Sequence, residues 1–231
     1  MSLKNFNNST KKILRITFLL IFILYYNNVY CQNSLKEFLK GITSNQTKKQ
    51  VEQAAEICRK FAGYVSNLFE DVIKSGKLKK YQVFDRFYIP VSISKYKEIL
   101  GSKFSRKYYS FPSQFTTSYT NFLEEKLLSY QKKLVAQYGF VYLVISDYNG
   151  YVPTHNKNEP LTGDLRKDLK NHRSRRIYSD VVGLRASRNT KIKVLLQYYS
   201  RDTSEKIIDI SSPIYILGKH WGCVRIGFKI N

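Results

Sequence analysis

An apolar stripe along residues 48–75 constrains the fold of this chain more than any other feature. Apolar residues recur there at steps of three and four, which is the spacing of one face of an α-helix. The stripe consists of Val51, Ala55, Cys58, Ala62, Val65, Leu68 and Val72. Gly76 follows it, and glycine is common just after a helix end. We therefore predict one long amphipathic helix whose apolar face packs against another part of the chain.

A second helix and several strands follow. Residues 121–138 place five apolar side chains near one another at helical spacing before Gly139, namely Phe122, Leu127, Leu128, Leu134 and Val135. Four later segments have the composition or alternation of strands, namely 140–146, 191–199, 212–217 and 221–230. Helices first and strands second predict an α+β fold, with the long N-terminal helix packed on a curved, mainly antiparallel sheet.

Two turn sequences predict how these strands connect. Asn149-Gly150 is typical of a hairpin turn and predicts that 140–146 pairs with 151–153. Gly218-Lys219 joins 212–217 to the last strand. That strand alternates two sets of residues, Val224, Ile226, Phe228 and Ile230 on one face and Trp221, Cys223, Arg225 and Lys229 on the other.

The first thirty residues have the pattern of a secretory leader. Lys11, Lys12 and Arg15 precede the apolar run 16–26, and a short polar stretch follows. A membrane helix needs about twenty apolar residues, so this run is short for a span. We predict that residues 1–31 are a signal peptide cleaved before Gln32; an uncleaved anchor and lipidation of Cys31 are the alternatives. Residues 32–231 would then be one domain in the periplasm or outside the cell.

The cysteines limit the metal chemistry. The chain has three cysteines and no CxxC pair, which excludes a tetrahedral thiolate zinc site and covalent c-type haem. Cys58 lies on the helix stripe and Cys223 on the last strand. We predict that both are free thiols, with a disulfide between them as the alternative that export allows.

The net charge is strongly positive. Lys and Arg number 39 against 17 Asp and Glu, which gives +22. Such an excess is typical of proteins that bind nucleic acid or another anionic surface. The basic residues are scattered along the chain, which favours a diffuse solvated surface, and export removes the domain from nucleic acid. We therefore expect no nucleic-acid partner.

A series of short motifs in the second half resembles a known family. They are DYNGYVPTHN at 147–156, PLTGD at 160–164, KDL at 167–169, RSRRI at 173–177, RNT at 188–190, QYY at 197–199, RDT at 201–203, DIS at 209–211 and HWG at 220–222. Together they resemble the extracytoplasmic sensor domain of bacterial methyl-accepting chemotaxis proteins, a Cache-type, PAS-like domain. The resemblance is dense over 140–228 and weak upstream, and it implies a ligand pocket between the sheet and its covering loops.

The resemblance and the residue chemistry together suggest which residues contact a ligand. The loop residues are Tyr151, His155 and Asn156; the residues that could bind a carboxylate are Arg173 and Arg176; the strand residues are Gln197, Tyr199 and Asp209. Each has a structural alternative. The loop residues can order the loop, the arginines around 173–176 can pair with Asp164, Asp168 or Asp180, and Asp209 can cap a turn.

These observations favour a non-catalytic ligand sensor. The histidines 155, 172 and 220 have no HxH or HExxH spacing, and no nucleophile–base pattern occurs, so we predict no metal, no cofactor and no enzyme activity. The ligand would be a small anion or an amino acid. The sequence contains no HAMP segment or methyl-accepting coiled coil, so we expect the domain to act through a membrane receptor or envelope protein. The alternative is a basic structural protein that binds anionic envelope surfaces.

Overall fold

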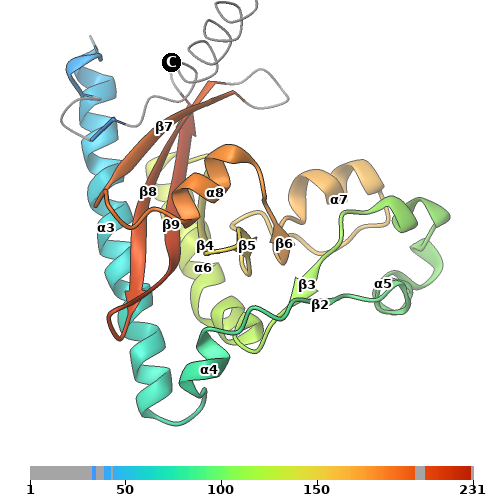
Figure 1. Cartoon of the computed structure of the whole chain (residues 1–231). Helices are drawn as coiled ribbons and strands as arrows, with labels where there is room; N and C mark the ends of the chain where they lie inside the picture. Colours follow the sequence, from blue (N-terminus) through green and yellow to red (C-terminus); the bar gives the residue numbers. More distant parts are fainter. Residues whose placement is uncertain (1–32, 35–38, 43, 201–205, 230–231) are drawn as a thin grey trace, which may run out of the picture. The chain divides into compact units, whose positions relative to one another are not determined.

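The computed structural model describes residues 33–34, 39–42, 44–200 and 206–229 (Figure 1). The predicted leader, its cleavage before Gln32 and the alternative at Cys31 lie outside the described residues. Within the described ranges, no helix is both long enough and apolar enough to cross a membrane.

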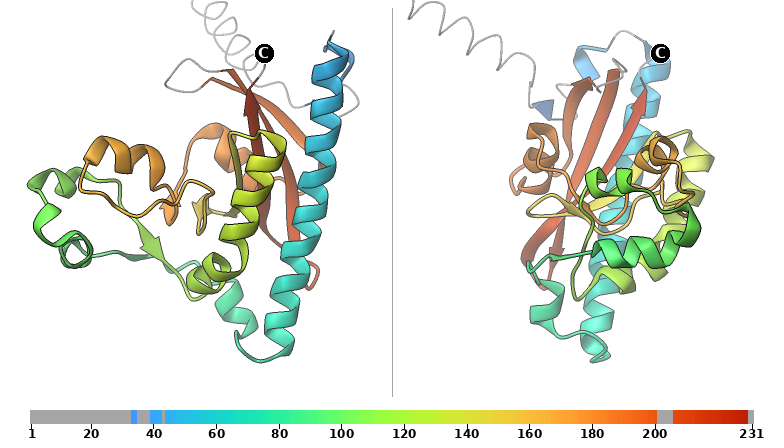
Figure 2. Two further views of the ribbon diagram at one scale, coloured as in Figure 1. Left: turned by 180° about the vertical axis from the view of Figure 1, so that it is seen from behind. Right: turned by 90° about the vertical axis from the view of Figure 1, so that its right-hand side faces the viewer.

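The helix predicted from the apolar stripe is α3, Asn45–Lys74. The Ser44 hydroxyl caps its first turn by accepting a hydrogen bond from the Thr47 backbone N–H, 3.3 Å away. The apolar face is buried along the helix and packs on strands β8, Lys206–Ile216, and β9, Lys219–Lys229 (Figures 1 and 2). The helix therefore finds its partner in the last part of the chain.

A five-stranded antiparallel sheet has the order β1-β7-β8-β9-β4. The remaining strands are β1, Asn33–Ser34, β7, Leu195–Ser200, and β4, Tyr142–Asp147. Leu217 and Gly218 have φ values of 48° and 74°, so the tight turn between β8 and β9 lies one residue earlier than predicted. The predicted α+β fold, with a long helix on an antiparallel sheet, is confirmed.

The second predicted helix is α6, Thr120–Tyr138, which packs beside β4. Gly139 ends it in the left-handed conformation, with φ of 67°, as the sequence predicted. Short elements complete this side of the molecule. They are α4, Lys80–Val83, and two small ladders that pair β2, Ile89–Pro90, with β3, Phe115–Thr116, and β5, Tyr151–Val152, with β6, Arg176–Ile177.

A smaller lobe, made of residues 91–111 and 161–172, extends away from α3 (Figure 1). It contains α5, Ile93–Leu100, η2, Gly101–Lys103, η3, Arg106–Ser110, and α7, Leu165–Asn171. Its own small core consists of Tyr96, Leu100, Tyr108 and Phe111. The buried Asp168 carboxylate joins the two segments of the lobe by accepting hydrogen bonds from the Tyr108 hydroxyl and the Thr162 hydroxyl.

The predicted hairpin ladder between 140–146 and 151–153 does not form, although Val144 and His155 make one isolated antiparallel bridge across the turn. β4 pairs with β9, whereas β5 pairs with β6. The turn itself forms, since the Gly150 N–H donates to the Asp147 carbonyl at 2.9 Å. However, the Asp147 carboxylate accepts the backbone N–H groups of Asn149 and Tyr151, at 2.9 and 3.0 Å. The Asp147 side chain thus satisfies two backbone donors beside the turn.

The same buried Asp147 connects three further segments. Its Oδ2 accepts hydrogen bonds from Arg86, Tyr88 and Tyr119 at 3.0, 2.7 and 2.9 Å. Burial and the nearby Asp147 charge raise the pKa of Tyr119, so its hydroxyl remains a donor. Because this buried charge is paired and its oxygens are hydrogen-bonded, we assign it a structural role.

Trp221 lies on the opposite face of the sheet from the predicted one. The register of β8 and β9 is interrupted between Ile214 and Tyr215, which leaves Trp221 as an extra residue between two pairs. A bulge of this kind reverses the alternation beyond it. The indole therefore packs on Phe69 of α3, with ring centroids 5.1 Å apart, and its N–H donates to the Val83 carbonyl at 2.9 Å.

Cys58 and Cys223 lie on opposite faces of the sheet. The Cys58 sulfur faces the carbonyls of Ile210 and Val224 from the α3 side. The Cys223 sulfur lies 3.8 Å from the Ser187 hydroxyl on the other side. Both are free thiols, as predicted, and burial raises the pKa of both, that of Cys223 to about 12.

Candidate functional site

The face of the sheet turned away from α3 carries buried polar side chains. The register places Gln197 opposite Asp209 and Ser211 opposite Arg225. Each of these four side chains belongs to a residue that is at most 8% exposed. Helix α8, Val181–Ser187, lies over this face. Burying polar groups costs free energy unless they are paired, so this face is built for something other than simple packing.

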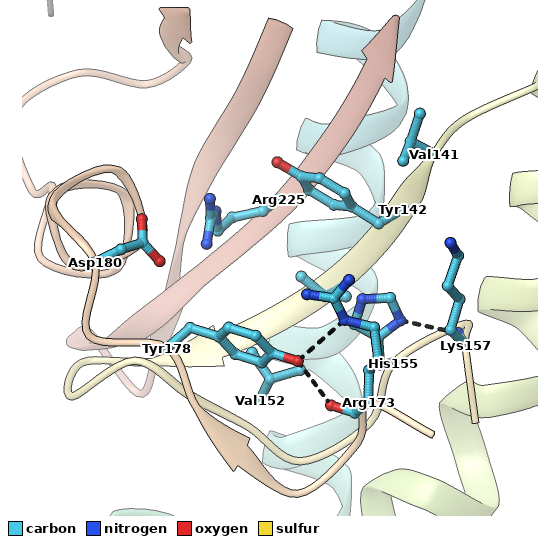
Figure 3. A pocket seen from close by; sticks show the side chains of 10 residues that line it. Val141, Tyr142, Val152, His155, Lys157, Arg173, Tyr178, Asp180 and Arg225 are labelled. Carbon is cyan, nitrogen blue, oxygen red and sulfur yellow. Dashed lines mark hydrogen bonds between the residues drawn. The ribbon is translucent and has the colours of Figure 1, made fainter. Parts of the chain in front are cut away.

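A pocket lies between this polar face and the segments that cover it (Figure 3). Its open space is about 540 Å³, including the solvent at its mouth. The sheet side contributes Val141, Tyr142, Val144 and Arg225. The covering segments contribute Val152, His155, Lys157, Arg173, Tyr178 and Asp180.

Arg225 is the most firmly positioned charged group of the pocket. Its Nε and Nη2 donate to Asp209 Oδ2 at 3.0 and 2.8 Å, and the Tyr142 hydroxyl donates to the same oxygen. Burial alone would lower the pKa of Arg225, but the Asp209 charge outweighs it and raises that pKa well above its usual value. Arg225 therefore stays charged, and its Nη1 donates no hydrogen bond to any residue that the structure describes.

A glycine of α8 makes room for this guanidinium. A Cβ atom at Gly183 would lie 3.1 Å from Arg225 Nη1 and 3.0 Å from Asp180 Oδ2. Asp180 caps α8, because its Oδ1 accepts the Gly183 backbone N–H at 2.9 Å. One end of the pocket is thus formed by Arg225 and by a carboxylate that has a fixed orientation (Figure 3).

Arg173 approaches from the covering side, next to Tyr178. Its guanidinium lies 5.7 Å from the centre of the Tyr178 ring, and the Tyr178 hydroxyl donates to the Arg173 carbonyl at 3.1 Å. The following residues anchor the segment. Ser174 Oγ accepts the His155 backbone N–H at 2.8 Å, and Arg175 pairs with Glu124 of α6. Arg175 has a φ of 64°, which is unusual for a residue with a side chain.

His155 lines the pocket as a neutral donor. Its Nδ1 accepts the Lys157 backbone N–H at 2.8 Å, so the ring proton lies on Nε2. An imidazole in this tautomer offers one N–H group. His155, Lys157 and Arg173 lie on the same side of the pocket (Figure 3).

The charge of the lining is mainly positive. Three cationic side chains, Lys157, Arg173 and Arg225, line it together with one carboxylate, Asp180. Arg176 lies nearby and is only 8% exposed. It has no ion-pair partner among the described residues, and its guanidinium lies 5.0 Å from the Phe111 ring centre. The three cations of the lining favour an anionic or partly anionic ligand.

The structure brings two of the eight predicted ligand residues into the pocket lining. These are His155 and Arg173. Asp209 lies behind the lining, where it holds Arg225 rather than capping a turn. Gln197 lies next to Asp209 and donates to the Val182 carbonyl of α8 at 3.1 Å. Tyr199 belongs to β7, but its side chain lies outside the description.

The other three predicted residues point elsewhere. The Tyr151 hydroxyl is bonded to Thr120 Oγ1 and donates to the Phe115 carbonyl, each at 2.9 Å. Asn156 accepts the Leu143 backbone N–H through Oδ1 at 3.2 Å. Arg176 donates to the His172 carbonyl. Tyr151 and Asn156 therefore order the loop, which is the structural alternative given above for them. Among the arginines, Arg175 pairs with Glu124 rather than with one of the three aspartates expected as partners.

Sequence reasoning missed most of the lining, above all Arg225 and Tyr142. The alternation of the last strand did place Arg225 opposite the apolar set Val224, Ile226 and Phe228. A charge at an interior strand position was therefore the available signal. Among the residues that the structure describes, no group of His, Cys, Asp or Glu side chains is arranged to hold a metal ion.

Comparisons with known proteins give a likeness to a solved structure. No protein-family model matches the sequence, and no protein of curated function matches it. The structure is similar to the sensory domain of the Campylobacter jejuni chemoreceptor Tlp3 (CcmL), which was crystallised with isoleucine bound. The identity is 16%, the TM-score is 0.31, and the match covers 82% of this chain. It covers 64% of the sensory domain, so the chain spans less than two thirds of that length.

Proposed function

We propose that this chain is a non-catalytic sensor domain of the Cache type, which binds a small anionic metabolite or an amino acid in the pocket of Figure 3. The observation that carries the proposal is the arrangement of Arg225. Asp209 and Tyr142 hold its guanidinium from behind, and Nη1 remains for a ligand. A guanidinium that is ordered before binding loses little entropy when it meets a carboxylate.

The rest of the lining supports binding rather than catalysis. Arg173 and Lys157 add positive charge to the lining, and His155 carries its ring proton on Nε2. The described lining residues include no serine, threonine or cysteine that an adjacent base could activate. Its one carboxylate, Asp180, already caps a helix. The motifs between 147 and 222 that resemble chemoreceptor sensors agree with the same role.

The affinity can be bounded from the groups present. Two charge-assisted hydrogen bonds of about 1.5–3 kcal/mol each supply about 3–6 kcal/mol, and a micromolar Kd, which needs about 8 kcal/mol, requires apolar contacts to Val141, Val144 and Val152 to supply the remainder. We further propose that the domain is exported by residues 1–31 and that a membrane receptor or envelope protein reads its occupancy. The lysine- and arginine-flanked apolar run 16–26 supports export.

A thermal-shift screen of organic acids and amino acids at about 150 mM salt tests the proposal. A hit should bind the wild type with micromolar Kd by calorimetry. Arg173→Ala should weaken it by about tenfold or more, because it removes a charge-assisted contact. Arg59→Ala is the matched control, since Arg59 is exposed on α3 and pairs only with Glu56. The proposal fails if no compound shifts the wild type, or if both variants bind every hit like the wild type.

A further inference from the structure

The exposed surface of the small lobe is predominantly basic. Residues 91–111 and 161–172 expose eight Lys or Arg side chains and only two carboxylates, Glu98 and Asp164. The long helices are almost balanced, since α3 has five basic and four acidic residues and α6 has three and two. The lobe therefore carries a local excess of positive charge within a chain that is basic throughout.

Most of these cations have no carboxylate to pair with. Lys95 pairs with Glu98, and Lys167 lies 3.9 Å from Asp164. No ion pair is formed within the described residues by the other six, which are Lys97, Lys103, Arg106, Lys107, Arg166 and Lys170. Six unpaired cations on one lobe form a positive surface that attracts an anionic partner.

Apolar side chains are exposed among these cations. Ile99 is 54% exposed, Tyr109 62% and Leu169 38%. They come from three different elements of the lobe, α5, η3 and α7, and the lobe lies at the end of the molecule opposite α3 (Figures 1 and 2). A soluble polyanion needs cations only, whereas a bilayer surface also accepts apolar and tyrosine side chains between its headgroups.

We propose that this lobe is a docking surface for an anionic lipid bilayer. The cations contact the headgroups, and Ile99 and Tyr109 enter the interfacial layer. The proposal is independent of the ligand pocket, because none of these residues lines it. It assigns the basic and apolar residues of the lobe to one partner.

Vesicle co-sedimentation of the full chain tests this surface. The probes are vesicles of phosphatidylcholine alone and of phosphatidylcholine with 30% phosphatidylglycerol. The test variant carries Lys103→Gln, Arg106→Gln and Lys107→Gln. Each basic residue near such a surface contributes about fivefold in affinity, so the triple variant should bind anionic vesicles about 100-fold more weakly. Residues 1–32 are the same in every protein, so their apolar run and their four cations contribute equally to each binding measurement.

A second triple variant provides the control. Lys49→Gln, Lys60→Gln and Lys74→Gln removes the same charge from exposed positions on α3, where acidic residues are interleaved. It should keep binding within a few fold of the wild type. Equal losses in the two triple variants would overturn the proposal in favour of a diffuse charge effect, as would no loss in either.

A third variant separates the bilayer from a soluble polyanion. Ile99→Ser with Tyr109→Ser should weaken binding to anionic vesicles but leave retention on heparin unchanged. Both side chains are exposed, so unfolding temperatures should match the wild type and show that the fold is intact. If this variant binds vesicles like the wild type, the surface recognises polyanions and the bilayer proposal is wrong.

Discussion

The two faces of the central sheet are made by the same strands but follow different chemistry. Toward α3, β8 and β9 present Ile208, Ile210, Val224 and Ile226, all at most 1% exposed and purely apolar. On the other face the intervening residues include Asp209, Ser211 and Arg225, which are also buried. The period of two in a strand thus separates a face that stabilises the fold from a face that holds a pocket. The two faces are equally buried, and what distinguishes the pocket face is its buried ion pair between Asp209 and Arg225.

The largest effect is expected from breaking the buried ion pair of the polar face. Asp209→Ala leaves the Arg225 charge buried without its carboxylate, so the free energy of unfolding should fall by about 3–5 kcal/mol. Replacing both residues, as Asp209→Leu with Arg225→Met, should recover much of that loss while ligand binding stays absent. Urea unfolding and calorimetry measure the two quantities.

Ile210→Ala is the matched change on the apolar face. It should lower the free energy of unfolding by about 2–5 kcal/mol through a cavity against α3, while the ligand Kd of the folded protein stays within twofold. If this variant loses ligand binding as Asp209→Ala does, the two faces are not functionally separate.

A single methyl group on the polar face should have the next largest effect. A Cβ at Gly227 would lie 2.2 Å from the Tyr142 ring, so Gly227→Ala must displace that ring. We expect a loss of about 1–3 kcal/mol in unfolding free energy and weaker ligand binding, because Tyr142 lines the pocket.

Gly63→Ala on α3 is the control, since its Cβ meets nothing within 4 Å. It should stabilise the helix by up to about 1 kcal/mol. Equal behaviour of the two variants in thermal unfolding would contradict this account of Tyr142.

Mild acid should weaken the fold through two histidines outside the apolar face. Burial lowers the pKa of His172 and of His220, so both are neutral in the folded protein where unfolded histidine begins to bind a proton. The free energy of unfolding is unaffected by these histidines above the ordinary pKa of about 6.5. Below it the unfolded chain binds protons that the folded protein does not, so the free energy of unfolding falls with pH. The urea midpoint should therefore be lower at pH 5.5 than at pH 7.5. In His172→Gln with His220→Gln this difference should shrink, and an unchanged difference would show that other groups cause it.

The smallest expected effect is a difference in thiol reactivity between the faces. Cys223 lies under the short helix α8, and Cys58 lies between α3 and the sheet. A short helix opens locally more easily than the main core, so maleimide should label Cys223 before Cys58 in native protein. Mass spectrometry of timed digests gives the order. Labelling of both at one rate would mean that both faces open only with global unfolding.

Local patterns in the sequence predicted the elements that local physics determines. The stripe from Val51 to Val72 and the end at Gly139 depend on residues within a few turns, and α3 and α6 follow them closely. The strands were also found, although β8 begins earlier than predicted. Their alternation indicated the two faces of the sheet, with Trp221 misplaced because it is the extra residue of a bulge in β9.

The site depends on contacts between distant residues, which no short window of sequence contains. The pocket joins residues from β4, from the chain after β5, from 173–180 and from β9. Tyr151 and Asn156 are close to His155 in sequence, but their polar groups are used by Thr120 and by the Leu143 backbone. Arg225 became a site residue only because Asp209 lies two strand positions away in the ladder.

The partnership of α3 with the C-terminal strands has a consequence for how the chain folds. The helix is made early in synthesis, but the sulfur of Cys58 meets the Ile210 carbonyl across a sequence separation of 152 residues. Contacts this distant in sequence form slowly, and the apolar stripe stays exposed until β8 and β9 exist. The whole stretch from α3 to β9 must therefore be synthesised before this part of the core can form, and until then the exposed stripe makes the nascent chain prone to aggregation.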